Sequence, residues 1–305
     1  MRKRKYPTHS KPRPTSIPSI IFFILCFGGL ITGTFYDVDV SDALYGKLRV
    51  VGIFAEIVGK LPFMIGLSAC AAIIGRYLVI CSNVNKKAAF VAAVGINVIG
   101  CCLCFSGLDA PSKNVPVTAA LSVCWQLGVW LCCRDMSKPL IKEKTPAAVS
   151  TLFAAAVMIV IICIAKLSVN RTRFCDLDAA RASFTPWYLP GMGGSSFFSG
   201  HATMAAGLLL YVRFVDTGIK KRGLFALVSL FFIIVSAGRI SVGAHFLSDV
   251  SVAGIVAIAT CLFAERILDP VVNSILCNLR DRPFWSPYKP FRRRTKPRLS
   301  RRPQK

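Results

Sequence analysis

The sequence has little charge for its length, and very little of that charge is acidic. Of its 305 residues only 17% are charged, with 14 Asp and Glu against 38 Lys and Arg, whereas 54% are hydrophobic. A soluble domain of this size would carry more charge and shorter apolar runs. The composition therefore argues against a soluble protein and predicts an integral membrane protein.

Disulfide and metal patterns are also lacking, although the chain has 13 cysteines. Most of them lie within apolar runs, where a thiol behaves as a small hydrophobic side chain. The densest cluster, at residues 101–104, falls inside a predicted membrane span. We expect no disulfide framework, no metal site and no cofactor. Histidine is scarce as well, and the three present are His9, His201 and His245.

What the sequence does contain is a series of apolar segments, and about 20 such residues cross a bilayer as a helix. The candidate spans are residues 17–36, 61–81, 88–108, 115–133, 147–167, 201–215, 224–237 and 245–265. No convincing cleavage site follows the first span, which is expected to be an uncleaved anchor. A short amphipathic helix is expected on the outer surface at residues 48–58. The predicted fold class is all-α, a polytopic transmembrane helical bundle of about eight spans.

Basic residues assign the two sides of the membrane. Residues 1–16 and 270–305 form strongly basic tails on either side of a transmembrane domain at residues 17–269. An even number of spans places both tails on one side, and the positive-inside rule makes that side cytoplasmic. We expect the tails to bind anionic lipid head groups. Nucleic acid is not an expected partner, because no nucleic-acid-binding fold accompanies the basic tails.

Several charged or titratable residues depart from this bias and lie on the outer side. Three groups contain them, which are Lys166 and Arg173; His201, preceded by Ser199 and Gly200; and Arg239, His245 and Asp249. Arg171 and Arg181 lie on the same side, and we expect them to bind substrate or lipid head groups. Lys and Arg together suit an oxyanion with several oxygens, above all phosphate. Backbone N–H groups at a helix start favour the same ligand. The pattern indicates a phosphate site at the outer face.

The two outer histidines can divide the work of phosphoryl transfer. Asp249 follows His245 by one helical turn and can orient its ring, which leaves the other nitrogen free to attack. His201 has no carboxylate near it in sequence and is better suited to be a general acid. Each group alone also has a plainer explanation, such as snorkelling at helix ends, a structural His–Asp pair, or metal ligands. The surrounding cations would repel a metal ion.

These three groups resemble the signature of the phosphatidic acid phosphatase type 2 (PAP2) superfamily, KxxxxxxRP, PSGH and SRxxxxxHxxxD. Every charged or histidine position of that pattern is filled, and the resemblance runs from Lys166 onward. The departures are Phe174 and Phe198, which replace prolines, and Gly238, which replaces a serine. They put the loop geometry and the substrate class in doubt more than the activity.

The resemblance implies a role for each matching residue. His245 would form a phosphohistidine, Asp249 would orient it, and His201 would protonate the leaving group. The phosphate would be bound by Lys166, Arg173, Ser199, Gly200 and Arg239. The family needs no metal and has a six-helix core, which implies a catalytic half at residues 147–269 and an extra hairpin within residues 86–134.

The resulting expectation is a metal-independent lipid phosphatase of a bacterial inner membrane, with its active site facing the periplasm. Its substrate would be a phosphate monoester or diphosphate of a lipid, such as lipid A, a polyprenyl diphosphate or phosphatidylglycerophosphate, and the motif wording is most similar to the lipid A group. The alternatives are a lipid phosphotransferase that uses the same site and a non-enzymatic anion transporter. The transporter predicts polar residues throughout the spans, and residues 224–237 and 250–264 have few.

Overall fold

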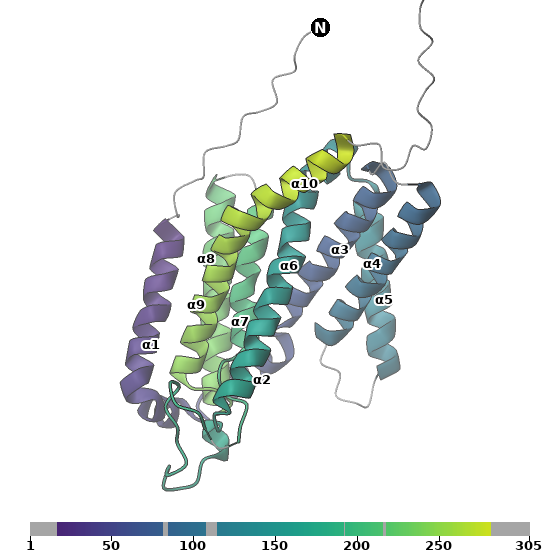
Figure 1. Ribbon diagram of the computed structural model, residues 1–305. Helices are drawn as coiled ribbons and strands as arrows, with labels where there is room; N and C mark the ends of the chain where they lie inside the picture. The colour runs from purple at the N-terminus through teal and green to yellow at the C-terminus, as the bar shows by residue number, and fades with distance from the viewer. Residues whose placement is uncertain (1–16, 82–84, 108–114, 192, 216–217, 282–305) are drawn as a thin grey trace, which may run out of the picture.

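The computed structural model describes residues 17–81, 85–107, 115–191, 193–215 and 218–281, and in these the regular structure is helical throughout (Figure 1). The predicted tail at 1–16 and most of the one at 270–305 lie outside these residues. The elements are α1 (Ile17–Leu44), α2 (Arg49–Val58), α3 (Leu61–Cys81), α4 (Lys86–Gly107), α5 (Val115–Arg134), α6 (Lys138–Val169), η1 (Phe174–Asp176), α7 (Gly200–Gly207), η2 (Leu208–Phe214), α8 (Gly218–Ser241), α9 (Leu247–Phe263), η3 (Ala264–Leu268) and α10 (Asp269–Asp281). The all-α fold class is confirmed.

Seven stretches of the described chain are long and apolar enough to cross a membrane. The predicted span at residues 201–215 forms α7 and η2, which have 8 and 7 residues and are together shorter than the others. Large apolar side chains cover the outside of the bundle, for example Phe90 at 61% and Leu227 at 62% exposure. In water this surface would be costly, whereas lipid tails accommodate it. The protein is a multi-pass membrane protein.

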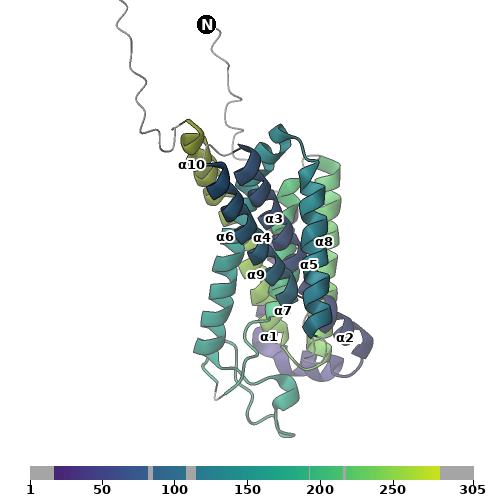
Figure 2. The ribbon, with the colours of Figure 1, turned by 90° about the vertical axis from the view of Figure 1, so that its right-hand side faces the viewer.

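The bundle has two parts that lie side by side (Figures 1 and 2). Helices α1, α6, α7, α8 and α9 pack together, while the hairpin of α4 and α5 packs against α3. Polar contacts hold the hairpin there, since Trp125 Nε1 donates to Ser68 Oγ at 3.0 Å and Gln126 Nε2 to the Ser68 carbonyl oxygen at 3.4 Å. Such hydrogen bonds join helices within lipid. The hairpin expected within residues 86–134 is therefore present, and it rests on α3.

The short helix expected at residues 48–58 is present as α2, which packs along α8. Its position on the outer surface stays a prediction. A side chain at Gly52 would collide with Val242, and one at Gly59 would lie 3.1 Å from Val235 Cγ1. Gly52 and Ala55 of α2, with Gly59 at its C-cap, form a face of small residues, which lets two helix backbones approach closely.

Helix α1 is longer than the predicted span. It continues to Leu44, with a break in helical geometry at Tyr36 (φ −128°, ψ 21°). The break lies one residue before Asp37, which the sequence placed in an outer loop. In the structure Asp37 lies within the helix and is only 3% exposed.

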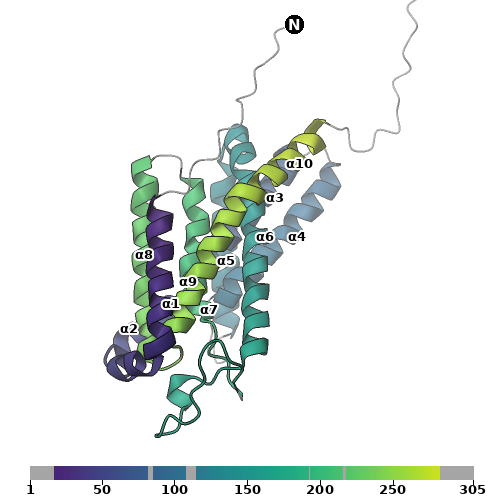
Figure 3. The same cartoon turned by 60° about the vertical axis from the view of Figure 1, so that its left-hand side comes forward.

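Helix α9 does not end near residue 265 as the sequence indicated. It continues through the π-helical turn η3 into α10, which ends at Asp281. Arg213 of η2 pairs with Asp269 at 2.8 Å and donates to Thr151 of α6 at 2.6 Å, so α10 is held to two other elements. The start of α1 and the end of α10 lie at one end of the bundle, opposite the long loop between α6 and α7 (Figure 3).

Candidate active site

The predicted site residues come from the ends of four helices. Lys166 lies in the last turn of α6, Arg239 in the last turn of α8, and His201 and Asp249 in the first turns of α7 and α9. The chain reverses direction between successive spans, so these four ends meet at the same end of the bundle as the α6–α7 loop (Figure 1). Three segments remote in sequence thus converge as predicted.

His245 lies in the short connection between α8 and α9 and is 4% exposed. Its Nδ1 is 2.7 Å from the backbone carbonyl oxygen of Ser196, and 3.7 Å from Asp249 Oδ2. The ring proton therefore has a nearby backbone acceptor in addition to the carboxylate predicted from the sequence. With Nδ1 engaged in this way, Nε2 is the nitrogen left for chemistry.

Asp249 is completely buried and is held on both of its oxygens. Oδ2 accepts from Ser196 Oγ at 2.5 Å and from the backbone N–H of Phe246, the N-cap residue of α9, at 2.9 Å. Oδ1 pairs with Arg171 at 2.6 Å. A carboxylate fixed by so many donors keeps one orientation toward His245.

Ser195 and Ser196 were not identified from the sequence, and the structure places them at the centre of the site. Lys166 Nζ donates to the Ser195 carbonyl, and Arg173 Nη2 donates to Ser195 Oγ at 3.1 Å. The Ser196 N–H donates to the Arg171 carbonyl at 2.9 Å, which fixes the position of both serines. The two cations predicted to bind phosphate are thus brought to one loop.

Electrostatic interactions extend this cationic group to the nucleophile candidate. Arg239 is 7% exposed, and its Nη1 lies 3.6 Å from Glu56 Oε2 of α2. Lys166 interacts electrostatically with Arg173 and Arg239, and His245 with Arg239 and Lys166. Burial lowers the pKa of His245 below its ordinary value of 6.5, Arg239 and Lys166 lower it further, and Asp249 opposes them. The imidazole is therefore neutral at pH 7 and able to act as a nucleophile.

The start of α7 adds backbone donors. Ser199 is the N-cap residue, and its Oγ accepts from the Ala202 N–H at 3.3 Å, while its own N–H faces the Asp249 carbonyl oxygen at 3.4 Å. Gly200 and His201 follow as the first helical residues, both partly exposed. The N-termini of α7 and α9 therefore meet, and His201 lies in the first turn of α7 at this junction. An anion there would face the positive ends of both helix dipoles.

Arg171 has a different place from the one the sequence indicated. The sequence favoured binding to substrate or to lipid head groups, yet Arg171 is 1% exposed and lies 4.0 Å above the Phe246 ring. It joins Asp249 to Asp37 of α1, with Arg171 Nη2 2.8 Å from Asp37 Oδ2. A basic residue on the outer side opposes the topological bias, and this was visible in the sequence. Its partner Asp37 could not be identified there, because it lies 134 residues away in the chain.

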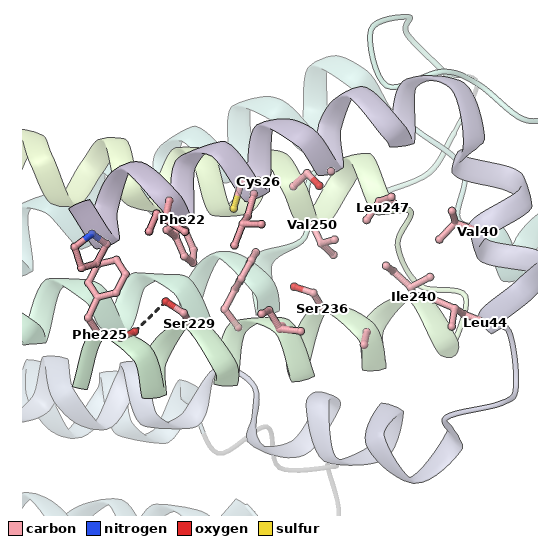
Figure 4. A pocket seen from close by; sticks show the side chains of 18 residues that line it. Phe22, Cys26, Val40, Leu44, Phe225, Ser229, Ser236, Ile240, Leu247 and Val250 are labelled. Atoms are coloured by element: carbon pink, nitrogen blue, oxygen red, sulfur yellow. Dashed lines mark hydrogen bonds between the residues drawn. The ribbon is translucent and has the colours of Figure 1, made fainter. Parts of the chain in front are cut away.

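The apolar cavity in Figure 4, of about 480 Å³, is separate from this site. It lies between α1, α8 and α9 and is lined by Phe22, Phe232, Leu247 and Val250, among others. Leu247 and Asp249 point in nearly opposite directions from α9, since two residues turn a helix by about 200°. Within the described chain, no three or more His, Cys, Asp or Glu side chains gather in a way that could hold a metal ion.

Comparison with known proteins agrees with this site. Residues 147–271 match the family model described as "PAP2 superfamily", and the match includes all eight predicted site residues. Its bounds lie in α6 and α10, so α1 to α5 fall outside it. Searches among curated proteins and among solved structures gave no match. The C-terminal half of this membrane protein is therefore similar to PAP2 phosphatases, and this similarity supports phosphatase or phosphoesterase activity.

Proposed function

We propose that the protein is an integral membrane phosphatase that removes phosphate from a lipid, a monoester or diphosphate of the lipid A, polyprenyl or phosphatidylglycerophosphate type. One observation carries the proposal. Lys166 and Arg239 act on a buried, neutral His245 whose Nδ1 is already hydrogen bonded, and Arg173 adds a third cation beside Lys166. Such an arrangement binds a phosphate dianion and presents a nitrogen nucleophile to it.

In the first step, His245 Nε2 attacks phosphorus and the bond between phosphorus and the lipid oxygen breaks. His201 donates a proton to that oxygen, so the lipid leaves as an alcohol, or as a monophosphate when the substrate is a diphosphate. Lys166, Arg173 and Arg239, with the N–H groups at Ser199 and Gly200, stabilise the charge on the equatorial oxygens. The product is a phosphohistidine whose ring is cationic and lies near Asp249.

In the second step, water attacks the phosphohistidine. His201, now neutral, takes a proton from the water, the bond between phosphorus and nitrogen breaks, and inorganic phosphate leaves. His245 returns to its neutral form and His201 to its protonated form, so the cycle closes. Each of these steps uses protein groups alone, and we propose that activity needs no metal ion.

We further propose that the protein lies in a bacterial inner membrane with this site on the periplasmic side. The loops with Lys86 and Lys87, with Arg134 and Lys138, and with Lys220 and Lys221 support this orientation, since basic loops face the cytoplasm. The site lies on the other side, where a lipid head group in the outer leaflet reaches it without leaving the membrane.

The test is phosphate release by purified protein from a panel of phospholipids and lipid A in detergent, with EDTA present. We expect release from at least one lipid, and its loss in His245→Gln. His9→Gln is the matched control, since His9 belongs to the N-terminal tail, and it should retain full activity. Full activity of His245→Gln would overturn the nucleophile assignment. Activity that EDTA abolishes and a divalent ion restores would overturn the metal-free mechanism.

A further inference from the structure

Asp37 reaches the site from a helix outside the PAP2 match. Its Oδ1 accepts from the Ser248 backbone N–H at 2.9 Å, at the positive end of α9, and its Oδ2 accepts from Ser248 Oγ. The approach requires Gly33 on the preceding turn of α1, where a Cβ would lie 2.7 Å from both Asp37 Oδ1 and Ser248 N. Helix α1 is therefore fitted closely against the start of α9.

Arg171 connects Asp37 to the site and uses all three of its guanidinium nitrogens. Nη2 pairs with Asp37 at 2.8 Å, Nη1 donates to Asp249 at 2.6 Å and to Ser248 Oγ at 2.8 Å, and Nε donates to the Thr185 carbonyl at 2.8 Å. A guanidinium held in this way cannot turn toward a substrate phosphate. Its contacts fix Asp249 and Ser248 instead.

The charges of this buried group do not cancel. Arg171 and Asp249 alone would form a neutral pair, and the second carboxylate gives the three residues a net charge of −1 when both acids are ionised. A buried Arg that is paired with only one carboxylate would offset the negative charge that Asp249 presents to His245. With Asp37 on its other side, Arg171 is neutralised from both directions.

We propose that Asp37 is a positioning residue of the active site, which acts through Arg171 to leave the negative charge of Asp249 available to His245. The catalytic meaning of this inference rests on the proposed function. The charge relation itself does not, because it concerns the buried imidazole in the resting protein. The net charge matters at His245 because the other charged groups that act on it, Arg239 of α8 and Lys166 of α6, are cations.

The direct measurement is the titration of His245 by NMR in protein with isotope-labelled histidine. The chain has only three histidines, so a His245→Gln variant assigns the signal by its disappearance. We compare wild type with Asp37→Asn and with Asp37→Asn combined with Arg171→Met. The net charges of the group are −1, 0 and −1 in this series, because the single change removes one negative charge and the double change also removes the positive one.

We expect the titration of His245 to move to lower pH in Asp37→Asn, by on the order of one pH unit for a unit charge at this range. In the double variant it should return to the wild-type position or above it. The non-monotonic order is the signature of a charge effect. A packing role would instead leave the isosteric Asn variant unchanged and make the double variant the more disturbed of the two.

Asp42→Asn is the matched control. Asp42 lies on the same helix as Asp37 and pairs with Arg181 at 2.7 Å, but both partners are partly exposed and neither contacts Asp249. His245 should titrate as in wild type. If the double variant does not fold, as judged by gel filtration and thermal melting, Asp37→Asn combined with Arg171→Gln replaces it. This variant has the same net charge of −1 and keeps an amide donor, so the titration should again return to the wild-type position or above it.

An unchanged titration of His245 in folded Asp37→Asn would overturn the proposal.

Phosphate release is measured in parallel and separates the charge relation from the proposed function. If the wild type releases no phosphate from any lipid while the titration follows the expected order, the proposed function fails and the charge relation stands. If the protein is active and the titration of His245 does not move in Asp37→Asn, the proposed function stands and the charge relation fails. In an active protein, the pH at which kcat/KM falls on the acid side should shift among the variants in the same order as the NMR titration of His245. We expect kcat to be lowered more than KM is raised.

Discussion

The sharpest prediction concerns the carboxylate beside the proposed nucleophile. Asp249→Asn preserves the shape of the side chain and removes its charge. Formation of the phosphohistidine makes the ring cationic, and Asp249 Oδ2 lies 3.7 Å from Nδ1. At an effective dielectric constant near 20, a unit charge at that distance is worth about 4 kcal/mol, or roughly a thousandfold in rate. Because the ring carries only part of that charge in the transition state, we expect kcat to fall between about a hundredfold and a thousandfold.

The assay is steady-state phosphate release at saturating lipid, which gives kcat, with a thermal melt of each variant in the same detergent. The amide can still accept from the Phe246 N–H, and Arg171 retains Asp37 as a partner, so the protein should fold. The matched control is Asp269→Asn, which breaks an Asp–Arg pair at the opposite end of the bundle. It should cost stability and leave kcat unchanged. Wild-type turnover in folded Asp249→Asn would refute the assigned role.

Three further predictions follow from the same geometry. The acid limb of kcat/KM should lie below pH 6.5, because burial lowers the pKa of His245 and the ring must be neutral to attack; a limb above pH 7 in a pH–rate profile would contradict this. Gly33→Leu should lower the free energy of unfolding by about 1–3 kcal/mol by overpacking the contact of α1 with α9, and should also lower kcat, as thermal melts and phosphate release would show. Reactive groups added at either terminus should resist membrane-impermeant labels in intact cells, and labelling without lysis would place the termini on the outer side instead.

Much of this architecture could be predicted because lipid imposes simple rules. Long apolar runs gave the spans, and the site residues could be grouped because their charges oppose the topology of the basic loops. Helix ends were harder to place. The sequence ended the first span at residue 36 because Asp37 is acidic, yet the structure buries that acid by pairing it with Arg171. Helix α2 looked interfacial by its pattern, and its small-residue face against α8 became visible only in three dimensions.

The site itself was only partly accessible from the sequence. The motif residues are identified by their spacing, but the acceptor of the His245 ring proton is a backbone carbonyl, and any residue at position 196 would supply one. The Ser196 hydroxyl and the Asp37 carboxylate contact Asp249 or its partner across 53 and 134 residues of sequence. Contacts of that kind depend on how the helices pack, which local patterns do not encode.

The position of Asp37 has a practical consequence for dividing this protein into parts. A fragment cut to residues 147–271 would keep every motif residue and lose one of the two carboxylates that balance Arg171. Chimaeras that exchange the N-terminal helices for those of another protein must therefore carry an acid at the equivalent depth of the first helix. The hairpin of α4 and α5 packs on α3 and supplies no residue to the buried group around Arg171. It is therefore the natural place to insert a tag or a fusion partner.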